Sequence, residues 1–452
     1  MSGKAKASRR SFISFLGGSG VAIAAAPLAN LSARKARLPN IVLITADDLG
    51  YGDLSSYGRA DFQTPVLDRL ASQGTRFTQA YAIAPVCTPT RVGLMTGRYP
   101  ARTSIGLREP LTLSSEDREL GLDPAHPTLS SLLKRAGYRN GLFGKWHLGI
   151  RSEFHPNRHG FDEFFGPLSG AVDYISHSDP TGRHDLHRNG DAVRATGYLT
   201  DLIADEAVRF IRQRREPFFL NHQGTAPHSP WQRPGDPPMG PSHGPFDIGP
   251  PDRFPDMMRA LDGAVGRILA ALDDTGVAER TLVIFTSDNG GKQYSNMAGL
   301  ARGKGHLWEG GLRVPAFVRW PSVIPSGETT RQVATTLDWT ATILAAAGVP
   351  PAPSHPLDGM NLLPVLAGGE PIDRMIFWRT AQRLQQKAVR DRGWKYLRDQ
   401  DREYLFDLVL DPGERSDLKG AEPEILQRLK ASYALWDREM LPAVPIKRGE
   451  PA

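Results

Sequence analysis

Two pairs of oxygen-bearing side chains follow apolar runs of the chain and could bind a divalent metal ion. Asp47 and Asp48 follow one such run. Asp288 and Asn289 follow another. Carboxylate and amide oxygens suit Ca²⁺ or Mg²⁺ and disfavour a structural zinc site. Either pair alone is weak support, because an acidic pair after a strand often caps a helix and Asp-Asn-Gly-Gly is an ordinary turn.

Basic side chains elsewhere could bind an anion beside such an ion: Arg91, Lys145, His147, His228 and Lys304. Lys145 and His147 are two residues apart, so an extended chain would place them on one face. Taken singly, a lysine in a glycine-rich loop is usually solvated and a histidine after a strand is usually structural. Together with a metal ion, these groups could stabilise the charge that develops on a tetrahedral oxyanion and could transfer a proton.

Cys87 is the one cysteine among 452 residues, so a disulfide within the chain is excluded. A free cysteine is most often an inert buried residue. Pro89, however, suits the first turn of a helix that continues through Arg91, which would put Cys87 at a cap-like surface position where the helix dipole is positive. That setting attracts anionic sulfur and makes Cys87 the candidate nucleophile.

Three apolar runs rich in β-branched residues predict strands buried on both faces: residues 40–46, 217–223 and 281–287. Amphipathic segments at 198–214 and 257–276 precede the second and third runs and predict helices. This alternation predicts an α/β fold with a large, mainly parallel mixed sheet flanked by helices on both faces. Sites in such sheets form beyond the carboxyl ends of the strands, where the polar residues above are found.

The chain changes character at about residue 353, where a proline-rich stretch precedes shorter alternating segments. Residues 388–399 and 402–414 predict a pair of antiparallel strands. A helix predicted at 424–440 would cover this small sheet. The aromatic residues expected in its core are Trp394, Tyr396, Tyr404 and Phe406.

Residues 1–37 have the pattern of a bacterial twin-arginine export signal: Arg9-Arg10, a weakly apolar run with glycines, then small residues. A membrane anchor is the alternative, but the run is short and glycine-rich for a stable span, and no later segment is long and apolar enough. Seven of the 55 Lys and Arg residues lie in this leader, which leaves 48 basic against 49 acidic side chains. We therefore expect an export translocon as partner, a periplasmic or secreted protein, and no nucleic-acid partner.

The segment CTPTR at 87–91 resembles the C-x-P-x-R signature of the formylglycine-dependent type I sulfatases, which are members of the alkaline phosphatase-like superfamily. Other segments resemble that family in the same order: ADDLGYGD, GKWHLG, PHSP, TSDNGG and GKGHLWEGGLRVP. The resemblance spans roughly residues 38–350 and extends to the family's small C-terminal subdomain. It implies an alkaline phosphatase-like fold with a catalytic domain at 38–352 and an α+β subdomain at 353–452.

In this family a separate formylglycine-generating enzyme oxidises the signature cysteine to formylglycine (3-oxoalanine), which is hydrated to a gem-diol. One diol oxygen attacks the sulfur of a sulfate monoester and displaces the alcohol. The other diol hydroxyl then loses its proton, and sulfate is eliminated. The resemblance therefore implies a sulfatase acting on an aryl or carbohydrate sulfate, that is, on a sulfated small molecule or glycan.

Carried over to this sequence, the resemblance implies that the ligands of a Ca²⁺ ion, or of Mg²⁺, are Asp47, Asp48, Asp288, Asn289 and the modified Cys87. It assigns the catalytic roles around the diol and the sulfate group to Arg91, Lys145, His147, His228 and Lys304. His147 would be the base in the elimination. Lys145, His228 and Lys304 would bind sulfate oxygens, and either His228 or Lys304 would give a proton to the leaving oxygen.

Two alternatives remain open. A phosphodiesterase or phosphonate monoester hydrolase of the same superfamily would use the diol on phosphorus. A non-catalytic exported binder of sulfated glycans would result if Cys87 stays unmodified. The polar stretch 169–198 is expected to overhang the site and to contact the sugar or aryl group of the substrate through His177, Arg183, His184 and His187. The alternative is that this stretch is a solvated loop without a role in binding.

Overall fold

The computed structural model describes residues 38–443 apart from 214, 216, 240–248 and 383. Residues from Leu38 onward form one compact unit. The export signal predicted at 1–37 lies outside the described residues, and the domain boundaries remain predictions. Over the part of the chain that is described, no helix combines the length and the apolar character needed to pass through a membrane.

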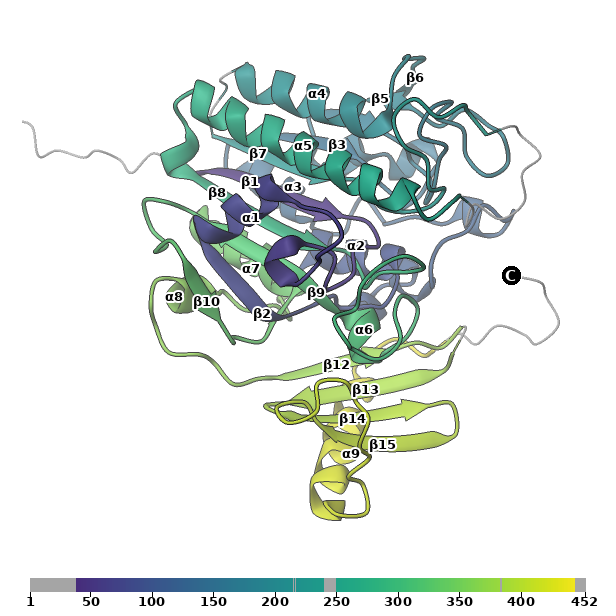
Figure 1. Cartoon of the computed structure of the whole chain (residues 1–452), viewed down its shortest axis with the longest axis vertical. Coiled ribbons are helices and arrows are strands. Elements are labelled where there is room, and N and C mark those ends of the chain that lie inside the picture. Colours follow the sequence, from purple (N-terminus) through teal and green to yellow (C-terminus); the bar gives the residue numbers. More distant parts are fainter. Residues whose placement is uncertain (1–37, 214, 216, 240–248, 383, 444–452) are drawn as a thin grey trace, which may run out of the picture. The chain divides into compact units, whose positions relative to one another are not determined.

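An eleven-stranded mixed sheet forms the centre of the unit (Figure 1). Its parallel core contains β1 (Asn40–Ala46), β3 (Arg139–Gly144), β4 (Glu163–Gly166), β7 (Phe218–Gln223) and β8 (Thr281–Ser287). β1 lies between β7 and β8 and is parallel to both, while β3 and β4 extend the sheet beyond β7. The three strands predicted from apolar runs are therefore neighbours at the centre of the sheet.

The other strands of this sheet lie toward its edges: β2 (Thr75–Tyr81), β5 (His187–Arg188), β6 (Asp191–Ala192), β9 (Arg313–Arg319), β10 (Glu328–Thr330) and β11 (Ala334–Thr335). β9 is antiparallel to both β8 and β2, and β10 and β11 pair with β2 in parallel. At the opposite edge, β5 and β6 are antiparallel. The predicted mainly parallel mixed sheet is confirmed.

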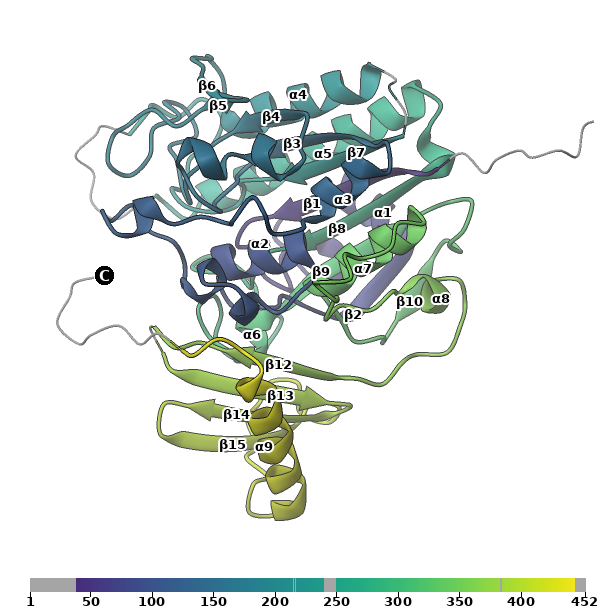
Figure 2. The same cartoon turned by 180° about the vertical axis from the view of Figure 1, so that it is seen from behind.

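Helices cover both faces of this sheet. One layer contains α1 (Pro65–Ser72), α4 (Leu199–Arg212) and α5 (Arg253–Asp274). The other layer, in front in Figure 2, contains α2 (Cys87–Thr96), α3 (Leu129–Arg135), α7 (Thr336–Ala346) and α8 (Leu363–Leu366). Val42 and Ile44 of β1 contact the first layer and Ile41 and Leu43 the second, because successive strand residues point to opposite faces.

Short helices occupy the connections. The 3₁₀ turns are Ser55–Tyr57, Pro100–Arg102, Ile105–Leu107, Asp117–Glu119, Ser152–Phe154, Pro156–His159 and Ala278–Arg280. The single turn α6 (Glu309–Leu312) leads into β9. The predicted helices at 198–214 and 257–276 correspond to α4 and α5, which pack side by side along the sheet.

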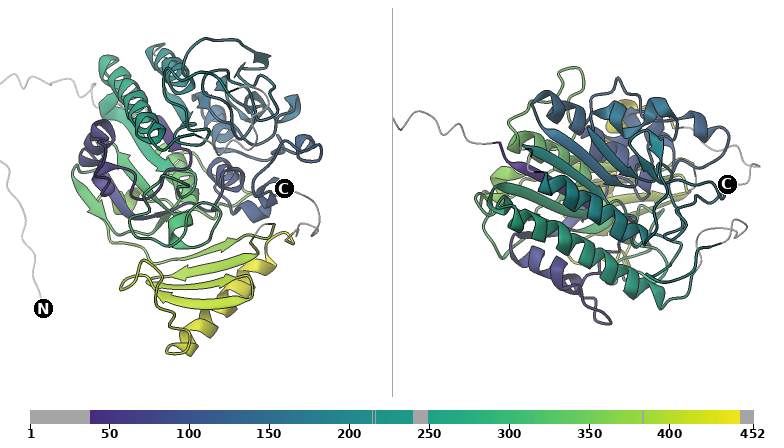
Figure 3. Two further views of the ribbon diagram at one scale, coloured as in Figure 1. Left: turned by 45° about the vertical axis from the view of Figure 1, so that its right-hand side comes forward. Right: turned by 90° about the horizontal axis from the view of Figure 1, so that it is seen from above.

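A second, four-stranded antiparallel sheet follows: β12 (Met375–Arg379), β13 (Gln386–Asp391), β14 (Trp394–Asp399) and β15 (Arg402–Asp407). Helix α9 (Pro423–Arg438), yellow in Figure 3, lies across one face. Tyr396 and Phe406 are buried in its core, and Trp394 and Tyr404 pack against that core. The small sheet and its helix are confirmed, but Leu366, which also follows residue 353, packs in the core of the large sheet.

The segment that enters α6 is bonded to the small sheet. The backbone N–H of Leu307 donates to Gln386 Oε1 at 2.8 Å, and Trp308 Nε1 donates to Asp399 Oδ2 at 2.9 Å. One residue further on, Glu309 belongs to a fully buried ion cluster with β14. These contacts tie the chain just before β9 to the neighbouring sheet.

The buried cluster consists of one lysine between two glutamates. Lys395 Nζ lies 3.0 Å from Glu309 Oε1 and 2.8 Å from Glu414 Oε1, and all three side chains are fully buried. Burial, opposed by Lys395, raises the pKa of Glu414 to about 7. Lys395 therefore compensates a concentration of acidic charge that has no contact with water.

Replacing Lys395 by methionine is expected to lower the free energy of unfolding by about 3–5 kcal/mol, because buried Glu414 loses its cation and buried Glu309 keeps only the more distant Arg313, at 3.8 Å. Equilibrium urea unfolding would measure the change. Lys387→Met is the matched control on β13. The Lys387 side chain is 37% exposed, and its ion pair with Asp437 should contribute less than about 1 kcal/mol to the free energy of unfolding. Equal stabilities of the two variants would contradict the expectation, and adding Glu414→Gln to Lys395→Met should restore part of the loss.

Candidate active site

The predicted metal-binding side chains meet beyond the carboxyl ends of β1 and β8. Ala46 pairs with Ser287 in the register of these strands, so Asp47 and Asp288 follow at the same level. The backbone N–H of Asp48 donates to Asp288 Oδ1 at 3.2 Å. Asn289 Nδ2 donates to Asp48 Oδ1 at 2.8 Å. Strand register thus brings two pairs that are about 240 residues apart in the sequence into one buried cluster.

The backbone at Asp48 explains how both aspartates face the same site. Its φ is 64°, a left-handed conformation that aspartate tolerates better than most residues. The chain therefore turns out of the sheet direction immediately after β1. Gly50 allows the close packing that follows, because a Cβ there would lie 2.8 Å from Asp53 Oδ2 and 2.9 Å from Asn296 O.

Cys87 begins helix α2 and lies against this cluster. Its Sγ atom is 3.5 Å from Asp47 Oδ1 and 3.6 Å from Lys304 Nζ. The predicted helix with Pro89 in its first turn is confirmed, but the position is buried, with 1% of the residue exposed, and is not a surface cap. Burial raises the pKa of the Cys87 thiol to about 12 in spite of Lys145 and Lys304. The expectation of an anion-stabilised sulfur is therefore wrong, because desolvation outweighs the nearby positive charge.

Each carboxylate of the cluster pairs with a cation: Asp47 with Lys145 at 2.6 Å, Asp48 with Lys304 at 2.6 Å, and Asp288 with Arg91 at 2.9 Å. Although burial favours the neutral acid, Lys304 and His228 hold the pKa of Asp48 below its usual range. Burial and the adjacent Asp47 raise the pKa of Asp288 to about 6. The site is thus rich in charge of both signs, and its carboxylates are held in place by ion pairs.

The donor atoms fit a hard divalent ion. Asp47, Asp48, Cys87 and His228 each offer a ligand atom, and these atoms lie within 4.8 Å of one another. Asn289 Oδ1 is buried and accepts no hydrogen bond from the described residues, so it is available as a further oxygen ligand. Carboxylate and amide oxygens in this number are typical of Ca²⁺ and Mg²⁺ sites.

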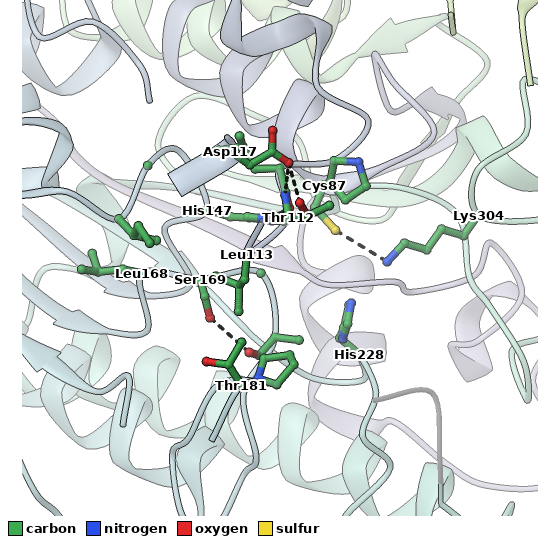
Figure 4. Close-up of a pocket in the computed structure, with 17 residues that line it drawn as sticks. Cys87, Thr112, Leu113, Asp117, His147, Leu168, Ser169, Thr181, His228 and Lys304 are labelled. Carbon is green, nitrogen blue, oxygen red and sulfur yellow. Dashed lines mark hydrogen bonds between the residues drawn. The ribbon is translucent and has the colours of Figure 1, made fainter. Parts of the chain in front are cut away.

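His147 and His228 face this region from two loops (Figure 4). His147 follows β3 with a φ of 57°, so it reaches the site by a left-handed turn and not along an extended segment. Its Nε2 lies 3.0 Å from Leu111 O, and a Cβ on Gly170 would come within 2.5 Å of its ring. Burial and Lys145 hold the pKa of His147 well below its usual range. Burial lowers the pKa of His228 to about 3, and its Nε2 is 3.7 Å from Asp48 Oδ2.

A cavity of about 290 Å³ opens from this cluster. Cys87, His147, His228 and Lys304 form one end of it (Figure 4). All ten site residues predicted from the sequence therefore lie at this cavity or in the ion-paired cluster that forms its base.

The stretch 169–198 contributes to the cavity wall through other residues than those expected. Ser169, Gly170, Ala171, Pro180 and Thr181 line the cavity. None of the basic residues singled out in the sequence belongs to the described lining: His177, Arg183, His184 and His187. The three histidines bond within their own loop, to Gly197 O, Val193 O and Asp185 Oδ1 respectively.

Sequence reasoning missed two residues that hold the site in place. Gln223, the last residue of β7, accepts a hydrogen bond from Arg91 Nη1 at 2.9 Å. Thr88 Oγ1 donates to His147 O at 3.3 Å and accepts from Leu111 N at 3.1 Å. Two features of the sequence could have indicated these residues: Gln223 ends a predicted strand, and Thr88 directly follows the cysteine.

Comparisons with known proteins agree with this geometry. The sequence model of the family described as "Sulfatase" matches residues 39–349, and that described as "N-sulphoglucosamine sulphohydrolase, C-terminal" matches 302–434. The chain is 33% identical to human N-acetylgalactosamine-6-sulfatase, over 90% of this chain and 87% of that protein. It is 35% identical to human arylsulfatase A, over 87% of each chain. The crystal structure of Ps i-CgsB superposes with a TM-score of 0.82 at 32% identity, covering 91% of this chain and 96% of that one.

Proposed function

The chain belongs to the sulfatase family and is a sulfuric ester hydrolase, and on this premise we propose that it acts through a formylglycine formed from Cys87, next to a divalent metal ion. Its substrate would be a sulfate monoester of a small molecule or a glycan. Its products would be the alcohol or phenol and inorganic sulfate.

The surroundings of Cys87 carry this proposal. The side chain lies between Asp47 and Lys304, at the end of a cavity that can hold a substrate. With a pKa of about 12, the unmodified thiol is protonated at neutral pH and is a poor nucleophile. When formed, the hydrated aldehyde would supply an attacking oxygen, and a bound divalent ion would stabilise its negative charge. The residues that would hold this ion, Ca²⁺ or Mg²⁺, are Asp47, Asp48, Asp288 and Asn289.

The cations and histidines around residue 87 have complementary tasks. Lys304 Nζ, 3.6 Å from Cys87 Sγ, is within reach of the oxygens of a sulfate group attached to or approaching residue 87. Lys145 and His228 would bind further sulfate oxygens, and His228 or Lys304 would give a proton to the leaving oxygen. Arg91 and Gln223 would keep Asp288 in place. His147, fixed by Leu111 O and Gly170, would accept the proton in the elimination step.

We also propose that residues 1–37 direct the protein to an export translocon and that it works in the periplasm or outside the cell. A formylglycine-generating enzyme would act on the chain before export. This proposal is supported by the order of the two steps. The oxidation of the cysteine takes place on the unfolded chain in the cytoplasm, and the twin-arginine route then carries the folded protein across the membrane. Replacing both Arg9 and Arg10 by lysine and following the protein in cell fractions would test this assignment.

Mass spectrometry combined with an ester assay tests the main proposal. In active protein we expect the peptide that contains residue 87 to have lost mass as CH₂SH becomes CHO. We expect 4-nitrophenyl sulfate to be hydrolysed faster than 4-nitrophenyl phosphate. A much faster phosphate reaction would favour the phosphodiesterase or phosphonate monoester hydrolase alternative. If Cys87 is entirely unmodified in an active preparation, the formylglycine mechanism is excluded. If Cys87 is unmodified and the protein binds sulfated glycans without hydrolysing them, the non-catalytic alternative is favoured.

A further inference from the structure

The wall of the cavity beyond Cys87 is mostly apolar. Apart from glycines, its apolar lining consists of Pro110, Leu111, Leu113, Ile150, Leu168, Ala171 and Pro180. These residues come from three loops, which follow the 3₁₀ turn Ile105–Leu107, β3 and β4. In Figure 4, Leu113 and Leu168 lie on the same side of the cavity, away from Lys304. Whatever is attached to the sulfate group therefore meets hydrocarbon in this direction.

The polar side chains of the wall are bonded to neighbouring protein groups. Thr112 Oγ1 donates to Asp117 Oδ2 at 2.6 Å, and Ser169 Oγ donates to Ala171 O at 3.1 Å (Figure 4). Thr181 Oγ1 donates to an aspartate of its own loop at 2.6 Å. The donor hydrogen of each hydroxyl is thus used within the protein, which leaves few groups to replace the water around a hydroxylated substrate.

Charge is concentrated at one end of the cavity. Among the described residues that line it, Lys304 is the one lysine, and no arginine, asparagine, glutamine or glutamate is present. Asp117, the one acidic residue of the described lining, accepts hydrogen bonds from Thr112 and lies 3.4 Å from Arg108 Nη1, so it offers no positive charge to a second anionic group on the substrate. Hydroxyl or carboxylate groups moved from water into this wall would lose hydrogen bonds without replacement, and that loss is unfavourable.

A second cavity of about 300 Å³ shares Pro110, Thr112, His228 and Lys304 with the first. Polar residues make up a larger share of its described lining, among them Glu109, Lys292 and Thr380. Its described lining does not include residue 87. A group that attacks from residue 87 expels the leaving group on the far side of the sulfur, and the first cavity is the one that has Cys87 at its end. Direction of attack therefore favours the apolar cavity for the leaving group.

We propose that this site is selective for sulfate esters of compact, uncharged, apolar alcohols or phenols, with a body of one or two rings seated against Leu111, Leu113 and Leu168. The inference rests on the proposed function, because it takes residue 87 as the attacking group. A volume of about 290 Å³ is at the lower end for small-molecule sites, which agrees with a body of this size. Sugars bearing further anionic groups are expected to be poor substrates.

Two esters of similar size test the selectivity. Cyclohexylmethyl sulfate and galactose 6-sulfate both release a primary alcohol carried on a six-membered ring, so the comparison isolates the polar groups of the sugar, which are its hydroxyls and its ring oxygen. With the full-length, formylglycine-containing protein we expect kcat/KM for cyclohexylmethyl sulfate to be higher by about tenfold or more. An equal or higher value for galactose 6-sulfate would overturn the inference while leaving the proposed function intact.

A substitution in the wall should change this ratio. Leu113→Asn is expected to reduce the preference for cyclohexylmethyl sulfate by about tenfold. Leu120→Asn is the matched control, because Leu120 belongs to the same loop region, is also partly buried and does not line the cavity. The ratio of two substrates is independent of the fraction of active protein, so partial misfolding does not imitate the effect. An unchanged ratio in Leu113→Asn would overturn the inference. The proposed function itself would be overturned if protein in which Cys87 has become formylglycine hydrolyses no sulfate ester, including 4-nitrophenyl sulfate.

Discussion

Replacing Cys87 by alanine is expected to lower kcat for any sulfate ester by about 10⁴-fold or more, since the variant cannot form the aldehyde. Because the residue is buried at the start of α2, the variant should also lose a little stability, about 1 kcal/mol, from the space left by the sulfur. Initial rates with 4-nitrophenyl sulfate and a thermal unfolding curve would measure the two effects. Activity near that of the wild type would contradict the mechanism.

Cys87→Ser is the informative companion to the alanine variant. A serine hydroxyl can attack sulfur, but it lacks the second hydroxyl whose deprotonation expels sulfate. The expected result is one burst of released alcohol followed by no further turnover, with a sulfate group retained on residue 87 and visible as added mass. Continuous turnover by the serine variant would show that the diol is not required.

Replacing Asp288 by asparagine is expected to empty the metal site and to lower activity by about 10³-fold, because the change removes one of three carboxylates and the nearer of the two anionic partners of Arg91. Metal analysis of the purified protein and kcat with 4-nitrophenyl sulfate would record both effects. Asp191→Asn, at an exposed position of β6, makes the same chemical change away from the site and should alter neither value. Chelation should inactivate the wild type, and added Ca²⁺ or Mg²⁺ should restore it. Activity that survives both the substitution and chelation would refute the ligand assignment.

The central strands could be predicted because each is a continuous apolar run bounded by polar residues. β1 and β8 begin and end at the predicted residues. Helices cover both faces of these strands, so each side chain in them must be apolar or must form hydrogen bonds within the protein. Parallel strands then bring their carboxyl ends to one edge of the sheet. The grouping of the aspartates with Lys145 and His147 follows from that topology.

Other features depend on contacts between residues that are distant in the sequence. β5, β6 and β11 are each two residues long, so no periodicity marks them. The burial of Cys87 results from the packing of α2 against α7 in the helix layer and from the approach of Asp47 and Lys304 to the thiol, and it reverses the effect that a helix terminus alone would have on the sulfur. In the same way, the histidines of 169–198 bond within their own loop, although their sequence resembles an exposed binding segment.

The bonds from β13 and β14 to Leu307 and Trp308 have a consequence for the enzyme as a whole. Lys304 is three residues before Leu307, so the strands that hold this segment also fix the root of the lysine that approaches Cys87. The small C-terminal sheet thus supports the segment that carries Lys304, and a substitution that breaks its bonds to Leu307 and Trp308 is expected to disturb the lysine that approaches Cys87.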